Sequence, residues 1–479
     1  MLLLLTLSFI NKLVSMTRSS FAELEGQLHQ DLLYGYNKIP RPIKNSTDVL
    51  TVNLGASLIR IIDVDEKNQI LTTNLWLEMQ WNDSKLTWDP SKYGGITALH
   101  IPSDQIWTPD LVLYNNAAGD PDITTSTDAL VAYDGRVLWQ PPAIYKSFCP
   151  IDVTWFPYDS QHCEMKFGAW SYTGYYVDLK QLPQDQVMNG IDKYGQDVET
   201  MKIGMDLSFF YQSAEWDLLS LSSARHSVFY ISCCGPEKYV DITYYFVLHR
   251  KTLFFTCNLI VPCFLISLLT TIVFYLTDHK ITFSISILVM LTVFFLVLID
   301  IIPPTSLVIP MFGRYLITTM ILVSLSTVIS VITVNFRFRS GSAYRMSPWI
   351  RKLFLHFLPK LIFHEIEDDK DFIHQHHYLN DFERSLSYKR NSVSKLLQQI
   401  RFIADHFRIN KEEAEISDEW IFAAMILDRL FLILFSVLNV GTLLILLEAP
   451  SLYDTRSPMN ITHATKPLGQ GNFLLPHSW

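Results

Sequence analysis

One apolar stretch, residues 280–302, has the length of a membrane span but also a partly polar face. If it is helical, spacings of four and three residues place six side chains in one column. This second-span column consists of Thr282, Ser286, Val289, Val293, Leu296 and Asp300. It runs from hydroxyls through branched aliphatic groups to a carboxylate, which suits the wall of a pore. The alternative is a packed membrane helix whose hydroxyls bond to their own backbone.

A second pattern consists of cysteines and aromatic residues. Cys149 and Cys163 enclose thirteen residues that include Phe156-Pro157-Tyr158-Asp159, and Cys233 lies directly beside Cys234. Farther upstream, Trp76 alternates with apolar neighbours and so shares the polar face of an expected strand. A tryptophan in that position is a candidate contact for a ligand or a partner subunit, or else a cross-strand packing partner.

Other classes of function find little support in the sequence. It contains no nucleophile-and-base constellation, glycine-rich phosphate loop or spaced set of metal ligands, so we expect neither an enzyme nor a bound metal or other cofactor. The net charge of −9 predicts no nucleic-acid partner. Four of the six cysteines fall in a region that we expect to be extracellular, where disulfides persist.

The chain is expected to comprise six segments. The apolar run near Met1 is too short to span a bilayer and predicts a secretory signal. The expected segments are a signal peptide (1–19), an extracellular ligand-binding β sandwich (20–250), three membrane helices (251–335), a cytoplasmic loop with amphipathic helices (336–419), a fourth membrane helix (420–447) and an extracellular C-terminal tail (448–479).

Alternating apolar residues predict the β sandwich. The apolar positions from Leu50 to Leu58 recur with a period of two, and similar segments separated by turn signals continue to about residue 248. A short amphipathic helix is expected at 21–34, before Pro40. Three Asn-x-Ser/Thr sequons are candidate glycosylation sites: Asn45, Asn82 and Asn460.

Four apolar spans, at 252–276, 281–302, 315–334 and 421–447, are long enough to cross a bilayer as helices. Arg337, Arg339 and Arg345 crowd the end of the third span, which places that end in the cytoplasm and both chain ends outside. Pro262 interrupts the first span. Helices are also expected on the inner membrane surface near 349–361 and from 392 toward the fourth span.

The segment from Cys149 to Cys163 resembles the signature of the Cys-loop, or pentameric ligand-gated ion channel, superfamily, and the resemblance extends over residues 50–447. The adjacent Cys233 and Cys234 resemble the vicinal disulfide of nicotinic acetylcholine receptor α subunits, in particular the invertebrate, nematode levamisole-sensitive type. The resemblance implies an extracellular all-β sandwich joined to a four-helix transmembrane bundle. It also implies one subunit of a pentamer, a multi-pass protein of the postsynaptic plasma membrane at neuromuscular or neuronal synapses.

The resemblance further implies that agonist sites lie between neighbouring sandwiches. Its motifs assign disulfides Cys149–Cys163 and Cys233–Cys234. Aromatic faces suit a quaternary ammonium group, which cannot donate a hydrogen bond, so acetylcholine or a similar cationic agonist is the expected ligand. The implied agonist-binding residues are Tyr114, Trp170, Tyr230, Cys233, Cys234 and Tyr239 on the principal face and Trp76 on the complementary face.

The pore and the coupling layer are also implied by the resemblance. His279 and the second-span column would line the pore, and the expected partners are other subunits of a hetero-pentamer, membrane lipid and permeating cations. The candidates that connect agonist binding to the pore are Glu66, Phe156, Pro157, Asp159, Arg250 and Pro303.

Three departures from the family pattern bear on the expected function. Ile231 occupies the place of a tyrosine, with Tyr230 one position earlier; His279 occupies the place of an inner-mouth glutamate; and Val289 replaces the usual leucine of the gate. The expected function is an acetylcholine-gated cation channel subunit. The alternatives are an anion-selective or non-conducting partner subunit, or a membrane-anchored ligand-binding or adhesion protein.

Overall fold

The computed structural model describes residues 22–119, 126–191, 197–229, 237–277, 279–301, 308–339, 345–361, 392–459, 468–469 and 473. The chain divides into two compact units. One is rich in strands, runs to Thr252 and includes the tail from Pro450, and the other is helical and contains Leu253–Ile301 and Ile309–Ala449. The expected combination of a β sandwich with a four-helix transmembrane region is therefore confirmed.

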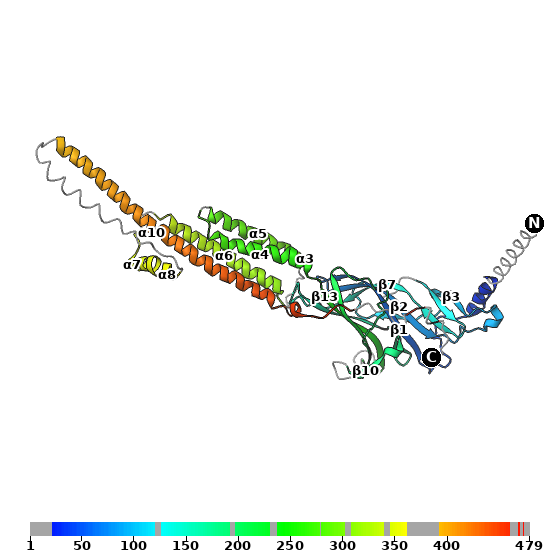
Figure 1. Ribbon diagram of the computed structural model, residues 1–479. Coiled ribbons are helices and arrows are strands. Elements are labelled where there is room, and N and C mark those ends of the chain that lie inside the picture. The colour runs from blue at the N-terminus through cyan, green and yellow to red at the C-terminus, as the bar shows by residue number, and fades with distance from the viewer. Residues whose placement is uncertain are drawn as a thin grey trace, which may run out of the picture. The chain divides into compact units, whose positions relative to one another are not determined.

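A seven-stranded sheet forms one layer of the sandwich (Figure 1). Its strands follow the order β3-β5-β6-β2-β1-β9, and β7 also pairs with β2. Their bounds are β1 Leu50–Asp65, β2 Ile70–Asn82, β3 Ala98–Pro102, β5 Asp128–Ala132, β6 Arg136–Trp139, β7 Pro142–Phe148 and β9 Val177–Gln181.

A six-stranded sheet forms the other layer, in the order β10-β11-β12-β13-β8-β4. Its longest strands, β12 and β13, are antiparallel along their whole length. The bounds are β4 Leu111–Leu113, β8 Ser160–Ala169, β10 Met188–Ile191, β11 Asp197–Met201, β12 Trp216–Phe229 and β13 Lys238–Arg250.

The core lies between the two sheets and contains the residues that alternation predicts. Leu50, Val52, Leu54, Ala56 and Leu58 of β1 are all buried, because their side chains point to the same face of the strand. The expected N-terminal helix occupies residues 22–33 and contributes Leu28 to this core. The Cys149–Cys163 disulfide is formed, and it joins the end of β7 to β8.

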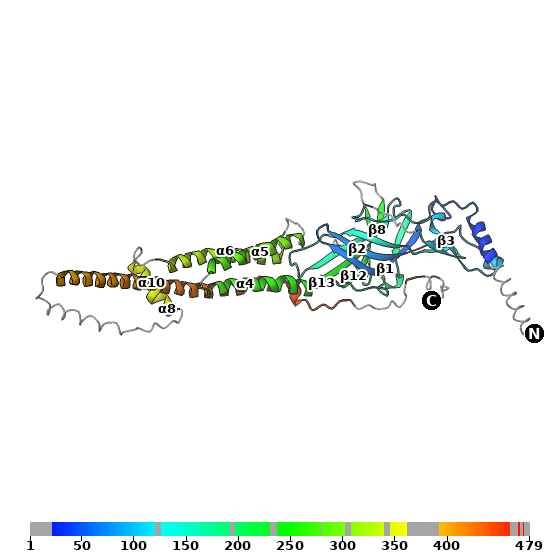
Figure 2. The same cartoon turned by 90° about the horizontal axis from the view of Figure 1, so that it is seen from above.

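The helical unit is a bundle in which α4 contacts α5, α6 and α10, and α6 contacts α5 and α10 (Figure 2). A π-helical turn at Thr256–Ile260 precedes Pro262, which lacks the backbone N–H that regular helical bonding requires. The bounds are α3 Leu253–Phe255, α4 Val261–Val273, α5 Lys280–Ile301, α6 Met311–Arg337 and α10 Ser392–Leu447, with α7 Pro348–Arg351, a second π-helical turn Lys352–Phe357 and α8 Leu358–Leu361 following α6.

Two boundaries differ from the sequence prediction. Helix α6 begins at Met311, directly after Pro310, rather than at Tyr315. The helices expected near 392–407 and 421–447 are one continuous helix, α10, of 56 residues. Both differences have the same cause: hydropathy marks where a helix is apolar, whereas backbone hydrogen bonding continues through polar residues until a proline or another breaker ends it.

Candidate functional site

The aromatic side chains of Tyr114 and Trp170 meet where β4 and β8 end. These strands pair so that Leu111 lies opposite Ala169. The ring centroids are 6.4 Å apart, and the Tyr114 hydroxyl donates to the Ala169 carbonyl at 2.7 Å. The Trp170 backbone N–H donates to the Asp110 carbonyl at 3.1 Å. Trp170 is nevertheless 70% exposed. A fixed backbone with an exposed indole is a suitable arrangement for binding a ligand from solvent.

Tyr239 lies on β13, the strand that pairs with β8. Asp241 lies opposite Gly168, and Tyr239 is two positions from Asp241, so the two side chains share one face of the sheet. Tyr239 is partly buried. We call Tyr114, Trp170 and Tyr239 the aromatic cluster. Three further residues of the expected site lie outside the described residues: Tyr230, Cys233 and Cys234.

A charge network around the buried Asp241 adjoins the aromatic cluster, and no sequence motif predicted it. The Lys166 ammonium lies 5.9 Å from the Tyr114 ring centroid and 3.2 Å from Asp241 Oδ1. Asp241 is buried, accepts a 2.9 Å hydrogen bond from the Thr243 hydroxyl, and lies 3.2 Å from His226 Nδ1. The available signal was an acid between the apolar residues Val240 and Ile242, because an acid that is buried with such neighbours needs a polar partner.

Trp76 lies on the other sheet. It points away from the core, is 42% exposed, and its ring is 5.5 Å from that of Phe209, which is also exposed. The predicted core face of β2, from Leu75 to Trp81, is buried. Glu78 was expected on the polar face with Trp76, and it is on that face, yet it is buried as well. The aromatic cluster and Trp76 therefore belong to different sheets, as expected of two half-sites that are completed by neighbouring subunits.

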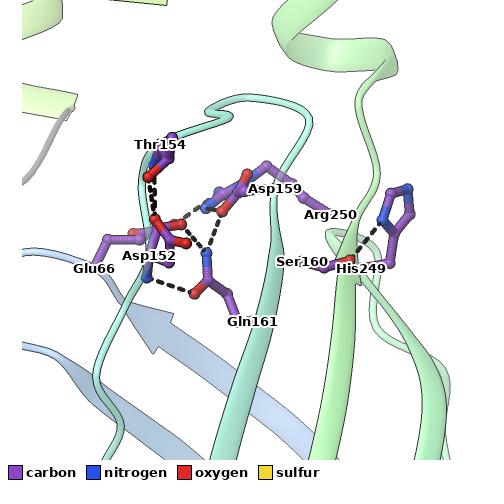
Figure 3. Close-up of polar contacts among 8 residues, drawn as sticks. All are labelled: Glu66, Asp152, Thr154, Asp159, Ser160, Gln161, His249 and Arg250. Carbon is purple, nitrogen blue, oxygen red and sulfur yellow. Dashed lines mark hydrogen bonds and ion pairs between the residues drawn. The ribbon is translucent and has the colours of Figure 1, made fainter. Parts of the chain in front are cut away.

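Glu66, Asp159 and Arg250 form one ion-pair network (Figure 3). Arg250 Nε and Nη2 donate to the two carboxylate oxygens of Asp159 at 2.7 and 3.0 Å, and Nη1 lies 2.7 Å from Glu66 Oε1. Gln161 Nε2 also donates to Asp159 at 2.5 Å. The network connects β1, the disulfide-closed loop and β13.

Arg250 remains charged although it is buried. Burial opposes the charge, but Asp159 and then Glu66 outweigh it and raise the pKa of Arg250 above its usual value. The guanidinium carbon also lies 5.1 Å from the Phe156 ring centroid and 4.3 Å from that of Trp216. Neither Gln161 nor Trp216 was predicted. Gln161 lies two residues from Asp159, whereas Trp216 lies opposite Arg250 only because β12 pairs with β13. Pro303 lies outside the described residues, and Pro157 lies within the same loop as Phe156.

Five members of the second-span column are exposed on α5: Thr282, Ser286, Val289, Val293 and Leu296. The opposite face is buried in the bundle through Ser284, Ile287, Leu291 and Leu298. The Ser286 hydroxyl donates to the Thr282 carbonyl at 2.9 Å, as the alternative interpretation expected, but the face that carries it is not packed within the subunit. Asp300, the last residue of the column, belongs to α5, but its side chain is not among those that the structure describes.

The two basic residues at the start of α5 have different environments. His279 is exposed and has a positive φ of 58°. Lys280 is buried and forms an ion pair with Asp428 of α10, while its ammonium lies 3.2 Å from the Thr333 hydroxyl and 5.0 Å from the Phe274 ring centroid. The charge of Lys280 is therefore neutralised inside the bundle rather than presented on the exposed face.

Family models match both units of the chain. The neurotransmitter-gated ion-channel ligand binding domain matches residues 25–252, and the neurotransmitter-gated ion-channel transmembrane region matches 259–377 and 363–446. The chain belongs to the neurotransmitter-gated ion-channel family. As a member of this family of channels, it is one subunit of a pentamer in the postsynaptic plasma membrane. The described residues include four helices of membrane-spanning length.

Similar members of the neurotransmitter-gated ion-channel family come from insects and nematodes. The acetylcholine receptor subunit beta-like 2 of Drosophila melanogaster is 44% identical over 491 residues, covering 94% of this chain and 92% of the relative. The alpha-type subunit unc-38 of Caenorhabditis elegans is 42% identical over 496 residues, covering 96% and 97%. The alpha-like subunit of Manduca sexta is 41% identical, covering 91% and 92%. The narrower nematode levamisole-sensitive type stays a prediction.

Proposed function

We propose that this chain is an α-type subunit of an acetylcholine-gated cation channel, in which it contributes the principal face of an agonist site and one pore-lining helix. The names of its relatives support the ligand. The observation that carries the proposal is the aromatic cluster: the exposed Trp170 ring lies beside Tyr114, and Tyr114 lies next to the Lys166–Asp241 ion pair. Such a cluster offers several aromatic faces to a cation that cannot donate a hydrogen bond.

The proposed site is completed by two elements. Tyr230 and the Cys233–Cys234 pair close over the agonist from the same subunit, and Trp76 of the neighbouring subunit supplies the complementary face. Each desolvated aromatic contact stabilises a cation by about 1 to 2 kcal/mol. Agonist opens the channel only to the extent that it binds the open state more tightly than the closed state.

The network around Arg250 is proposed as the coupling layer. Glu66, Asp159 and Arg250 tie three segments of the sandwich together through short ion pairs. A rigid connection of this kind passes a shift of β13 to the loop that contains Phe156 and Pro157. We assign the link that contains Pro303 as the element on the membrane side that receives this shift.

The second-span column is proposed to line the pore. Its exposed face is apolar at Val289 and Val293, which suits a constriction that closes by expelling water. Cation selectivity is supported by Asp300 at the outer end and by the withdrawal of Lys280 into its ion pair. His279 supplies no acid at the inner mouth, so the remaining acids come from other subunits of a hetero-pentamer.

The agonist site is tested with Trp170→Ala in cells that co-express partner subunits. We expect the acetylcholine concentration for half-maximal current to rise about 30-fold, which corresponds to the loss of about 2 kcal/mol. Trp170→Phe should cause a smaller rise, because one aromatic face remains. Trp349→Ala, an exposed tryptophan of the helical unit, is the matched control. An unchanged response in Trp170→Ala at equal surface expression would remove the assignment.

The pore is tested with Val289→Ser. A hydroxyl at the constriction favours wetting, so we expect half-maximal current at an acetylcholine concentration several-fold lower. Reversal potentials under sodium and chloride substitution, measured on the same receptors, decide between the cation channel and an anion-selective subunit. Surface receptors that bind acetylcholine but carry no current in any subunit combination would indicate the membrane-anchored ligand-binding alternative.

A further inference from the structure

The C-terminal tail packs on the strand-rich unit. After α10 the tail passes Met459, whose backbone N–H donates to the Leu218 carbonyl of β12 at 2.8 Å. Farther on, Leu468, Gly469 and Phe473 contact the seven-stranded sheet. The tail had been expected to be an extracellular segment, and its sequence carried no signal for a binding partner.

Strand register shows which face of the sheet the tail covers. Gly55 of β1 lies opposite Glu78 of β2, and Gln80 lies opposite Leu138 of β6. Leu138 in turn lies opposite Leu130 of β5. The residues between these positions, such as Leu77 and Val137, belong to the core. Because side chains alternate along a strand, these five residues share the outer face of the sheet.

Each described tail residue contacts a different strand of this face. A methyl group on Gly55 would lie 2.9 Å from Leu468 Cδ1, so Leu468 lies directly over the bare backbone of β1. The Gly469 backbone N–H donates to the Glu78 carboxylate on β2. Phe473 packs on β5 and β6, and it is only 4% exposed. The three described tail residues therefore lie on strands from β1 to β5.

The contacts at Phe473 are specific. Its ring lies against Leu130, Ala132 and Leu138. Arg136 Nη1 donates to the Phe473 carbonyl at 2.8 Å, and the Arg136 guanidinium carbon lies 5.0 Å from the ring centroid. A buried aromatic residue that also receives a charge-assisted hydrogen bond at its backbone is an anchor of the kind that dominates binding surfaces.

Trp76 lies on this same outer face, two positions from Glu78 along β2. Four residues of strand separate Trp76 from Gln80, the residue opposite Leu138, which is about 13 Å. A standard protein interface covers about 800 Å² on each partner, equivalent to a disc about 16 Å in radius. A neighbouring subunit centred on Trp76 therefore requires the surface that Phe473 occupies.

We propose that the C-terminal tail caps the complementary face of the unassembled subunit and that the neighbouring subunit displaces the tail when the pentamer forms. This inference rests on the proposed role of Trp76 in the complementary face. Before assembly, the tail shields Leu130 and Leu138, which would otherwise expose an apolar patch. The tail binds this surface as an intramolecular ligand. During assembly the neighbouring subunit binds the same surface through a larger interface and displaces the tail.

A disulfide trap tests both parts of the proposal. The full chain with Leu138→Cys and Phe473→Cys is co-expressed with partner subunits, and unassembled and pentameric pools are separated by sedimentation. Mass spectrometry of unreduced peptides then measures the disulfide between the introduced cysteines in each pool. We expect at least fivefold more of it in the unassembled pool. Leu138→Cys with Leu452→Cys, which places the second cysteine at an exposed tail position, is the matched control.

Each outcome has a defined meaning. Absence of the disulfide from both pools overturns the docking of the tail, and equal amounts overturn its displacement. If the first pair does not fold, Leu130→Cys with Phe473→Cys reports the same contact. Phe473→Ala, with its weaker anchor, should raise the pentameric share at least twofold, and a decrease would contradict the proposal.

The role of Trp76 is tested separately from the tail. An unchanged acetylcholine response in Trp76→Ala removes the complementary-face assignment. A weakened response together with equal trapping in both pools overturns the displacement alone.

Discussion

Two buried cations, one in each unit of the chain, are stabilised in different ways. Arg250 in the strand-rich unit is bound by both oxygens of Asp159, by Glu66 and by two aromatic rings. Among the described residues, Lys280 in the helical unit has one carboxylate partner, Asp428, with a hydroxyl and one ring nearby. The Asp159 side chain is almost completely buried, whereas that of Asp428 is 20% exposed.

The difference shows what each pair contributes. A planar guanidinium presents several donors in a fixed arrangement, so Arg250 holds two carboxylates at once and fixes the relation of three chain segments. An ammonium is a point charge, so the Lys280 pair joins two helices without strict orientation. We infer that the Arg250 network determines whether the sandwich forms correctly. The Lys280–Asp428 pair makes a smaller contribution to the stability of a bundle that apolar packing already holds together.

The largest effect is expected from Arg250→Gln. It leaves the buried Asp159 carboxylate without its cation, which destabilises the folded state by about 3 to 5 kcal/mol. Surface labelling and the thermal midpoint of solubilised subunits measure the loss. Arg250→Lys should have a thermal midpoint between those of Arg250→Gln and the wild type, because lysine keeps the charge but cannot bind two carboxylates in the same geometry.

Arg456→Gln is the control for Arg250. It removes one partner of an exposed pair with Asp454 and should leave surface labelling unchanged. Equal losses in Arg250→Gln and Arg456→Gln would show that burial of the Arg250 network contributes nothing.

A smaller effect is expected from Lys280→Met. The Asp428 side chain is less buried than that of Asp159, so the unpaired acid should cost less, about 1 to 3 kcal/mol. The double variant Lys280→Met with Asp428→Leu removes both charges and should recover most of the thermal midpoint. If the double variant has the same thermal midpoint as Lys280→Met, the hypothesis that the Lys280–Asp428 pair only neutralises a buried charge is wrong.

The smallest effect concerns Glu78, a buried acid that accepts hydrogen bonds from the side-chain amides of Gln80 and Gln140. Desolvation by burial raises the pKa of Glu78 from its ordinary value of 4.5, and nearby Asp206 raises it further, against hydrogen bonds from Gln80 and Gln140. The folded state therefore binds a proton more tightly than the unfolded chain does. The free energy of unfolding falls as pH rises from about 4.5 through the higher folded pKa.

Glu78→Gln removes this pH dependence. We expect the variant to exceed the wild type in thermal midpoint at pH 7, with an advantage that shrinks toward pH 5. Glu164→Gln, an exposed position on β8, should show no such pattern. A constant difference between Glu78→Gln and the wild type across this range would refute the role of the buried charge.

Much of the fold was predictable because it depends on local periodicity. The alternation from Leu50 to Leu58 identified the buried face of β1, and the spacing from Thr282 to Leu296 identified a face of α5 that the bundle leaves exposed. The end points of α6 and α10 were not predictable from hydropathy, because hydrogen bonding continues beyond the apolar residues.

Site residues that belong to a recognisable sequence motif could be predicted. Site residues that meet only through the pairing of distant strands could not. Tyr114 and Trp170 were identified by resemblance, and the structure brings them together. Lys166 and Asp241 meet only because β8 pairs with β13 in one particular register. The burial of Glu78 could not be predicted from the alternation of β2, and one of its hydrogen-bond partners, Gly469, lies nearly 400 residues later in the chain.

The unbroken length of α10 has a mechanical consequence. At about 1.5 Å per residue, its 56 residues form a rod about 84 Å long. The part that precedes residue 421 is about 44 Å of helix outside the apolar span. Because no loop interrupts α10, a twist or lateral push on the part before residue 421, which we expect to be cytoplasmic, would be transmitted along the helix to the fourth span.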